Sequence, residues 1–231
     1  MDGREWMRRH CGRPALLVSV AVLALLAFYY FARADTIGVY SPGRGWTAMT
    51  ASPLPAMVHF SISALLLGVL PLALARWFTG LSLKELGLGF GNWRGGLLIL
   101  AIGVPAGVLA GKIASASPAM QAVYPLDPAL TLSGFLPHAL LGFLYFGAWE
   151  VLFRGVLLFG LKDSVGAGSA NVLQTALSVV AHFGRPVTET FAALPAGLVF
   201  GWVDLRVGSI WYVAIVHWVV ATSMDYFILI G

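Results

Sequence analysis

Residues 146–155 read Phe146-Gly-Ala-Trp-Glu-Val-Leu-Phe-Arg-Gly155, which places a carboxylate and a guanidinium inside an apolar run long enough to cross a bilayer. Glu150 and Arg154 are four residues apart, so on a helix they lie on one face and can pair. A charged residue at the centre of a membrane helix costs roughly 2.5 to 3.5 kcal/mol, and such residues usually face a bundle interior and mark function. The stretch therefore predicts a helix inside a membrane bundle, with a purely structural ion pair as the alternative.

The composition places the chain among polytopic membrane proteins. Of its 231 residues, 59% are hydrophobic and 10% are charged, with a mean hydropathy of +0.85. Soluble proteins contain about 25% charged residues. The net charge of +4 does not indicate nucleic-acid binding, because most basic residues lie between apolar runs, where they orient the chain in the membrane. The single cysteine, Cys11, allows no intramolecular disulfide.

Apolar segments of spanning length predict an all-α bundle of about seven transmembrane helices. They cover residues 15–31, 54–78, 95–111, 132–161, 170–183, 191–205 and 210–230. We expect the first to be an uncleaved helix. The fifth is short and polar, so we place it inside the bundle. The fourth is long enough to tilt, to extend beyond the bilayer, or to break near Pro137.

The segments divide the chain into three regions. We expect residues 1–14 to form a basic tail, residues 15–131 to form N-terminal transmembrane helices and loops, and residues 132–231 to form a helical bundle that contains Glu150 and Arg154. The stretch 81–90 is amphipathic and fits an interfacial helix or a plain connector equally well.

Basic residues predict the orientation in the membrane, since cytoplasmic segments carry more Lys and Arg. With alternating spans, the N-terminal side holds Arg4, Arg8, Arg9, Arg13, Arg76, Lys84, Arg94, Arg154, Lys162 and Arg206, and the other side holds Arg33, Arg44, Lys112 and Arg185. We therefore expect a multi-pass protein of the inner (plasma) membrane with a cytoplasmic N-terminus.

Two of the five histidines lie where chemistry is expected. His182 ends the polar fifth segment and His217 is in the middle of the last one, whereas His10, His59 and His138 fit solvated or packing positions better. We expect His182, His217 and Glu150 to converge on one buried polar site, with Arg154 holding the carboxylate. Such a carboxylate can act as a general base. With neutral histidines it could activate water and stabilise an oxyanion, which is peptide-bond hydrolysis without a nucleophilic side chain.

The run 150–155, His182, the Gly-rich stretch 196–202 and His217 resemble the CPBP (CAAX protease and bacteriocin-processing, or ABI) intramembrane proteases over residues 132–231. The family pattern is Glu-Glu-x-x-x-Arg, Phe-x-x-x-His and His-x-x-x-Asn on neighbouring helices, and order and spacing match here. Three positions depart from it. Trp149 replaces the Glu usually assigned to water activation, Ser178 replaces the Phe, and Ala221 replaces the Asn expected to help hold the oxyanion.

These departures fit an inactive relative or a subgroup in which Glu150 is the base alone, and the coherent surrounding motifs favour the second. The combination is similar to the myxosortase-like branch, whose members are thought to remove C-terminal membrane anchors from sorted surface proteins. That resemblance adds Glu189 and Asp225 as supporting residues. Asp225 lies about 12 Å along the helix from His217, too far for direct contact. Glu189 is expected to orient His182 or to pair with Arg185.

Other functions are compatible with parts of the sequence. Glu150, His182 and His217 could be three zinc ligands with water as the fourth. Haem ligation by the two histidines would leave Glu150 and Arg154 unexplained. Residues 166–170 faintly resemble the serine motif of rhomboid proteases, although Ser169 is explained as a helix cap. A transporter is disfavoured because the spans show no inverted repeat.

The sequence therefore predicts a glutamic-type intramembrane endopeptidase. Glu150 is the general base, His182 and His217 position water and stabilise the oxyanion, Arg154 fixes Glu150, and Glu189 and Asp225 support the site. We expect no metal or other cofactor. The partners are a membrane-anchored or lipidated protein substrate and the lipid bilayer, with no nucleic acid. The alternative is a non-catalytic scaffold or immunity protein of the same family.

Overall fold

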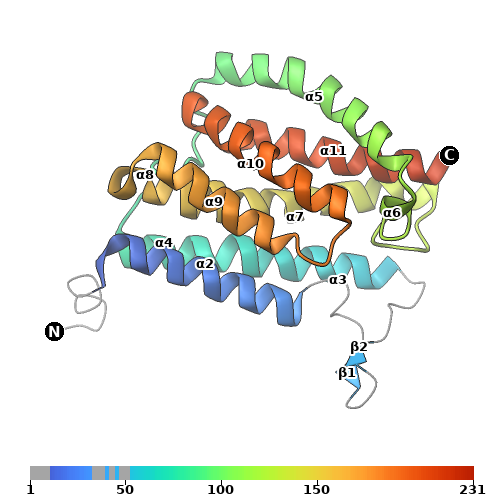
Figure 1. Cartoon of the computed structure of the whole chain (residues 1–231), viewed down its shortest axis with the longest axis horizontal. Coiled ribbons are helices and arrows are strands. Elements are labelled where there is room, and N and C mark those ends of the chain that lie inside the picture. The colour runs from blue at the N-terminus through green and yellow to red at the C-terminus, as the bar shows by residue number, and fades with distance from the viewer. Residues whose placement is uncertain (1–10, 33–39, 42–44, 47–52) are drawn as a thin grey trace.

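A computed structural model describes residues 11–32, 40–41, 45–46 and 53–231, which form a bundle of long helices (Figure 1). The helices, in chain order, are α2 (Gly12–Phe31), α3 (Pro53–Ser63), the π-helical η1 (Ala64–Val69), α4 (Leu70–Thr79), α5 (Trp93–Ser115), α6 (Pro118–Gln121), the 3-10 turn η2 (Leu132–Gly134), α7 (Phe135–Glu150), the π-helical η3 (Val151–Phe159), α8 (Gly160–Val165), α9 (Ala167–Ala181), α10 (Val187–Val207) and α11 (Trp211–Ile230). Two short strands, β1 (Tyr40–Ser41) and β2 (Gly45–Trp46), pair in antiparallel fashion, with Tyr40 opposite Trp46. The predicted all-α polytopic bundle is confirmed.

Six helices of the described chain are long and apolar enough to cross a membrane. They are Gly12–Phe31, Ala56–Thr79, Trp93–Ser115, Leu132–Val165, Val187–Val207 and Trp211–Ile230. The predicted fifth span corresponds to α9, which has 15 residues. At the usual helical rise it is about 22 Å long, short of the roughly 30 Å hydrocarbon core. Its polar side chains Gln174, Thr175 and Ser178 are buried, whereas Val172 and Val180 on its other face are exposed, so only the polar face of α9 is inside the bundle.

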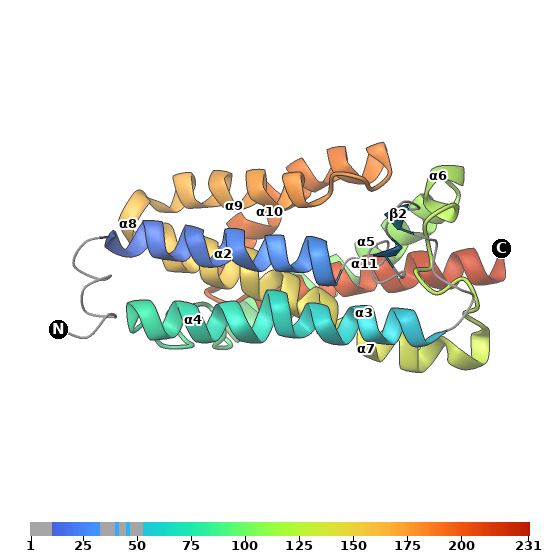
Figure 2. The same ribbon diagram turned by 90° about the horizontal axis from the view of Figure 1, so that it is seen from below.

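The fourth span is one continuous helix from Leu132 to Val165 and forms the centre of the bundle. It passes Pro137 without a break. It changes instead to a π-helix at Val151, directly after Glu150. Such wide turns are frequently found at functional sites. The segment η3 is buried along its whole length, and α2 lies alongside η1 and α4 on one side of it (Figure 2).

The stretch 81–90 forms turns, so the interfacial-helix reading was wrong and the connector reading holds. Leu81 and Leu86 are buried rather than directed at lipid. The carbonyl of Gly87 accepts a hydrogen bond from the amide of Ile210 at 3.0 Å, just before α11 begins. The connection is therefore fixed against the rest of the bundle.

Close helix packing joins α5 to α11, which lie side by side (Figure 1). Glycines on one face of α5 make this possible, namely Gly96, Gly103, Gly107 and Gly111. A Cβ atom added at Gly111 would lie 2.6 Å from the carbonyl oxygen of Val220 and 2.8 Å from the amide nitrogen of Met224. Small residues at such spacing let membrane helices approach closely.

Gly111→Ala is expected to destabilise the fold, because the added methyl group would clash with the backbone of α11, and the two helices would have to move apart. Overpacking of this kind typically costs about 1–3 kcal/mol. The check is the thermal unfolding midpoint of the purified protein in detergent. Gly168→Ala is the matched control, since a Cβ atom there would meet nothing within 4 Å. Equal midpoints for the two variants would contradict the packing argument.

Candidate active site

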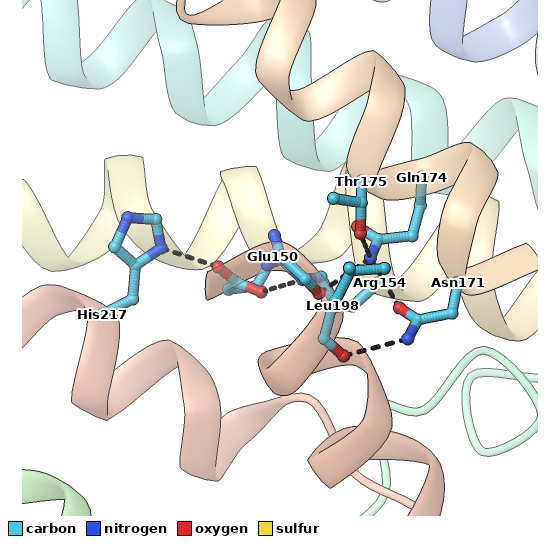
Figure 3. Close-up of polar contacts among 8 residues, drawn as sticks. Glu150, Arg154, Asn171, Gln174, Thr175, Leu198 and His217 are labelled. Carbon is cyan, nitrogen blue, oxygen red and sulfur yellow. Dashed lines mark hydrogen bonds and ion pairs between the residues drawn. The ribbon is translucent and has the colours of Figure 1, made fainter. Parts of the chain in front are cut away.

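Glu150 is the centre of a buried charged cluster at the junction of α7 and η3. The residue is fully buried. The Nδ1–H of His217 donates to its Oε1 at 2.7 Å, and its Oε2 lies 3.1 Å from Nε of Arg154 (Figure 3). The second contact is an ion pair without hydrogen-bond alignment. The structure therefore places Glu150, Arg154 and His217 in direct contact with one another.

His217 is the member of this cluster that reaches open space, since its side chain is 24% exposed whereas that of Glu150 is 0% exposed. An ionised carboxylate can only accept hydrogen bonds, so the proton of a neutral His217 is on Nδ1. The Nε2 atom then carries a free lone pair. Glu150 thus fixes both the orientation and the tautomer of the imidazole.

His182 lies at the end of α9, where the helix stops. Its Nδ1–H donates to the carbonyl of Ser178 at 2.7 Å, and its ring stands edge-on to Trp149 with centroids 5.1 Å apart. Its hydrogen bond is therefore made to the backbone rather than to Glu150. A neutral His182 also presents Nε2 as an acceptor.

A cavity of about 710 Å³ brings the predicted residues together. His182, His217 and Arg154 line it, and so do the three positions at which the family motif is altered, Trp149, Ser178 and Ala221. Its volume lies within the range of ligand pockets. Most of the remaining wall is apolar, with residues from α5, α7, α10 and α11. Glu150 is behind this wall and reaches the cavity through His217.

Glu189 lines the same cavity and has a partner that the sequence had not suggested. The hydroxyl of Tyr124 donates to both carboxylate oxygens of Glu189, at 2.9 and 3.0 Å, whereas the sequence had suggested His182 or Arg185. Desolvation raises the pKa of the Tyr124 phenol well above its usual value, so the hydroxyl keeps its proton and donates it. The guanidinium of Arg185 lies over the Tyr124 ring at 5.6 Å. Tyr124 could not be found from sequence because it is 65 residues from Glu189.

Asp225 also lines the cavity and is paired with His138, a histidine that the sequence had not linked to the site. The Nε2 atom of His138 lies 3.0 Å from Oδ2 of Asp225, and both residues are buried. The contact follows from antiparallel packing, since the end of α7 meets the first half of α11 at Glu150 and His217. The start of α7 must then meet the end of α11. The sequence did indicate that Asp225 has a partner, because a charged residue inside a spanning helix is usually paired.

Asp225→Ala is expected to lower stability by about 1–3 kcal/mol, because it leaves the buried imidazole of His138 without its partner. Asp225→Asn keeps a side chain that can accept the hydrogen bond and should retain most of the stability. Thermal unfolding of both variants in detergent checks this. Equal losses for Ala and Asn would show that the hydrogen bond is not what stabilises this contact.

A second polar network holds α9 against α10. The amide of Gln174 donates to Asn171 Oδ1 at 2.9 Å, Thr175 Oγ1 at 2.7 Å and the carbonyl of Gly197 at 3.1 Å (Figure 3). Asn171 in turn donates to the carbonyl of Leu198 at 2.9 Å. These contacts explain the polar face of α9 structurally and fix the wall that carries His182.

Asp204 on α10 is a further buried carboxylate that the sequence analysis missed. It is fully buried, and neither of its oxygens has a hydrogen-bond partner among the described residues. It is not part of the cavity wall. An acidic residue near the end of a spanning helix is usually interpreted as a charge at the membrane interface. The burial of Asp204 could therefore not be inferred from sequence.

The structure does not place the residues of the rhomboid-like serine site together, nor those of the zinc site around a common metal position. Ser169 is exposed in the first turn of α9 and does not line the cavity. It does not cap the helix either, since the N-cap is Gly166. Among the described residues, no group of three His, Cys, Asp or Glu side chains is placed to hold a metal ion. A zinc site made by Glu150, His182 and His217 would need these side chains to move.

Residues 131–223 match the family described as type II CAAX prenyl endopeptidase Rce1-like. No curated protein and no solved structure matches the chain. The matched stretch contains Glu150, Arg154, His182 and His217 and ends before Asp225. The resemblance seen in the sequence is confirmed at family level, whereas the myxosortase-like branch stays a prediction.

Proposed function

Residues 131–223 match the Rce1-like CAAX protease family, and from this premise we propose that the chain is an intramembrane endopeptidase that hydrolyses a peptide bond in a membrane-anchored protein. The family match and the six apolar helices support a membrane endopeptidase in general. The observation that carries the specific proposal is the 2.7 Å hydrogen bond from His217 to the buried Glu150 at the wall of the cavity.

In this proposal His217 is the general base and Glu150 orients it. The sequence had suggested Glu150 as the base, but its carboxylate is fully buried and holds His217 and Arg154. The Nε2 atom of His217 takes a proton from a water molecule in the cavity, and the hydroxide attacks the substrate carbonyl. Glu150 stabilises the imidazolium that forms, without itself taking the proton. His217 then returns the proton to the leaving amine nitrogen.

Two further side chains complete the proposed chemistry. His182 presents Nε2 as an acceptor, so it positions the attacking water rather than donating to the oxyanion. Ala221 offers no donor. Arg154 lines the cavity, and its Nη1 has no hydrogen-bond partner among the described residues, so this guanidinium is our candidate for stabilising the oxyanion. A preorganised cation in a water-poor site is well suited to that task.

The proposed substrate is an apolar peptide segment, because the walls of the cavity are mostly apolar. Removal of a C-terminal sorting anchor is the specific form suggested by the branch resemblance. We place the protein in the plasma membrane with its N-terminus in the cytoplasm, which the distribution of Lys and Arg supports.

A survey of membrane-protein C-termini tests the proposal. Cells lacking the chain are complemented with wild type, His217→Ala or Ser169→Ala, and insertion of each variant is verified by its amount in membranes. We expect uncut anchors to accumulate with His217→Ala and normal processing with Ser169→Ala. Loss of processing with Ser169→Ala alone would favour a serine nucleophile. Identical C-termini in all three strains would favour the non-catalytic scaffold.

A further inference from the structure

Basic residues gather at one end of the bundle. They lie at the start of α2, in the last turns of α4 and α10, at the start of α5, in α8 and in the connection before α5 (Figure 1). These residues are Arg13, Arg76, Lys84, Arg94, Lys162 and Arg206. Within the described chain, the opposite end carries Lys112 and Arg185. Cytoplasmic segments of membrane proteins carry the excess of Lys and Arg, so the basic end faces the cytoplasm.

Contacts between distant segments confirm that these basic residues share one end. The amide of Asn92, before α5, donates to the carbonyl of Val207 in the last turn of α10 at 2.7 Å. At the start of α8, a Cβ atom added to Gly160 would lie 2.9 Å from the side chain of Leu17 in α2. The charges therefore form one face of the bundle.

The cavity lies on the other side of the bundle from this face. Its outer wall is built by the connection after α5, by the connection between α9 and α10, and by the C-terminal half of α11, with Met120, Tyr124, Arg185, Glu189 and Asp225. Its inner limit is formed by Arg154, Phe200 and His217. None of the six basic residues at the basic end lines it.

The position of His217 sets the depth of the inner limit. His217 is the seventh of the 20 residues of α11, about 9 Å along the helix from its start at the basic end. From Glu189 to Phe200 along α10 the cavity wall spans about 16 Å at the usual rise. The hydrogen bond between Tyr124 and Glu189 joins the connection after α5 to the first turn of α10, at the outer rim of the cavity. The cavity thus extends from the level of His217, in the first half of α11, toward the end with few basic residues.

We propose that this cavity is reached from the non-cytoplasmic side of the membrane and that the substrate is a polypeptide segment presented in the outer half of the bilayer. The identity of the occupant as a substrate rests on the proposed function, whereas the side of access does not. The consequence for the reaction is that the peptide bond is cut on the side away from the cytoplasm.

Thiol labelling tests the side of access. In a Cys11→Ser background, single cysteines are placed at the rim (Thr188→Cys), in the cavity wall (Ala193→Cys) and beside Lys162 at the basic end (Ser164→Cys). Right-side-out and inverted membrane vesicles are treated with a sulfonated maleimide, which does not cross the membrane. We expect Thr188→Cys and Ala193→Cys to be labelled only in right-side-out vesicles and Ser164→Cys only in inverted ones.

The opposite pattern would overturn the proposal. So would labelling of Ser164→Cys with neither of the other two cysteines labelled in either orientation. Labelling needs no cleavage, so the experiment is independent of the enzymatic claim. An inactive chain with the expected pattern would refute the proposed function alone, whereas an active protease with cavity labelling from the cytoplasmic side would refute the side of access alone.

Discussion

Glu150→Gln is expected to reduce peptide-bond cleavage by about 10⁴-fold per molecule of inserted protein, as when the orienting carboxylate of a catalytic triad is replaced by its amide. The amide has nearly the shape of the carboxylate. It cannot stabilise an imidazolium, and its NH₂ group competes with the Nδ1–H of His217 for the same position. The measurement is the amount of cut substrate in membranes carrying equal amounts of each variant.

Asp204→Asn is the matched control for this change. It also converts a fully buried carboxylate to an amide, but Asp204 is outside the cavity wall and neither of its carboxylate oxygens has a hydrogen-bond partner among the described residues. Cleavage by this variant should stay near that of wild type. Equal losses from the two substitutions would mean that buried charge in general, rather than the bond from Glu150 to His217, supports activity.

Arg154→Ala is expected to give the largest loss of stability. The side chain of Arg154 is 3% exposed and lies 3.1 Å from the fully buried Glu150. Removing one partner of a buried ion pair leaves an uncompensated charge and typically costs about 3–5 kcal/mol. The variant should therefore unfold at a markedly lower temperature in detergent, or fail to accumulate in membranes.

Arg206→Ala serves as the comparison, because Arg206 is exposed in the last turn of α10. Its loss should change the unfolding temperature little, since exposed charges contribute at most about 1 kcal/mol. If Arg154→Ala were as stable as Arg206→Ala, Glu150 would have to be neutral or otherwise compensated. The account of its ionised carboxylate would then be wrong.

Features that depend on neighbouring residues in the sequence were predictable. The spacing of Glu150 and Arg154 indicated their contact, because residues four apart share a helix face. The apolar runs indicated the spanning helices, since length and hydropathy are local properties. The polar residues of α9 indicated which face of this helix is buried, whereas its opposite face is exposed and its length is short of a span.

Features that depend on which helices are neighbours were not predictable. His138 and Asp225 are 87 residues apart, and Tyr124 and Glu189 are 65 apart, so their contacts exist only once α7, α10 and α11 are packed. The role proposed for Glu150 changed for the same reason. Its residue type suggested a base, whereas its complete burial behind His217 favours an orienting carboxylate.

A double-mutant cycle on cleavage tests the central claim that Glu150 and His217 act as one unit. Rates are measured with purified wild type, Glu150→Gln, His217→Ala and the double variant in liposomes, using a membrane protein found uncut in the His217→Ala strain. Residues that act as a unit are strongly non-additive. We predict that the double variant is no slower than the slower single variant. Losses that multiply, or a His217→Ala protein that cleaves at the wild-type rate, would contradict the account.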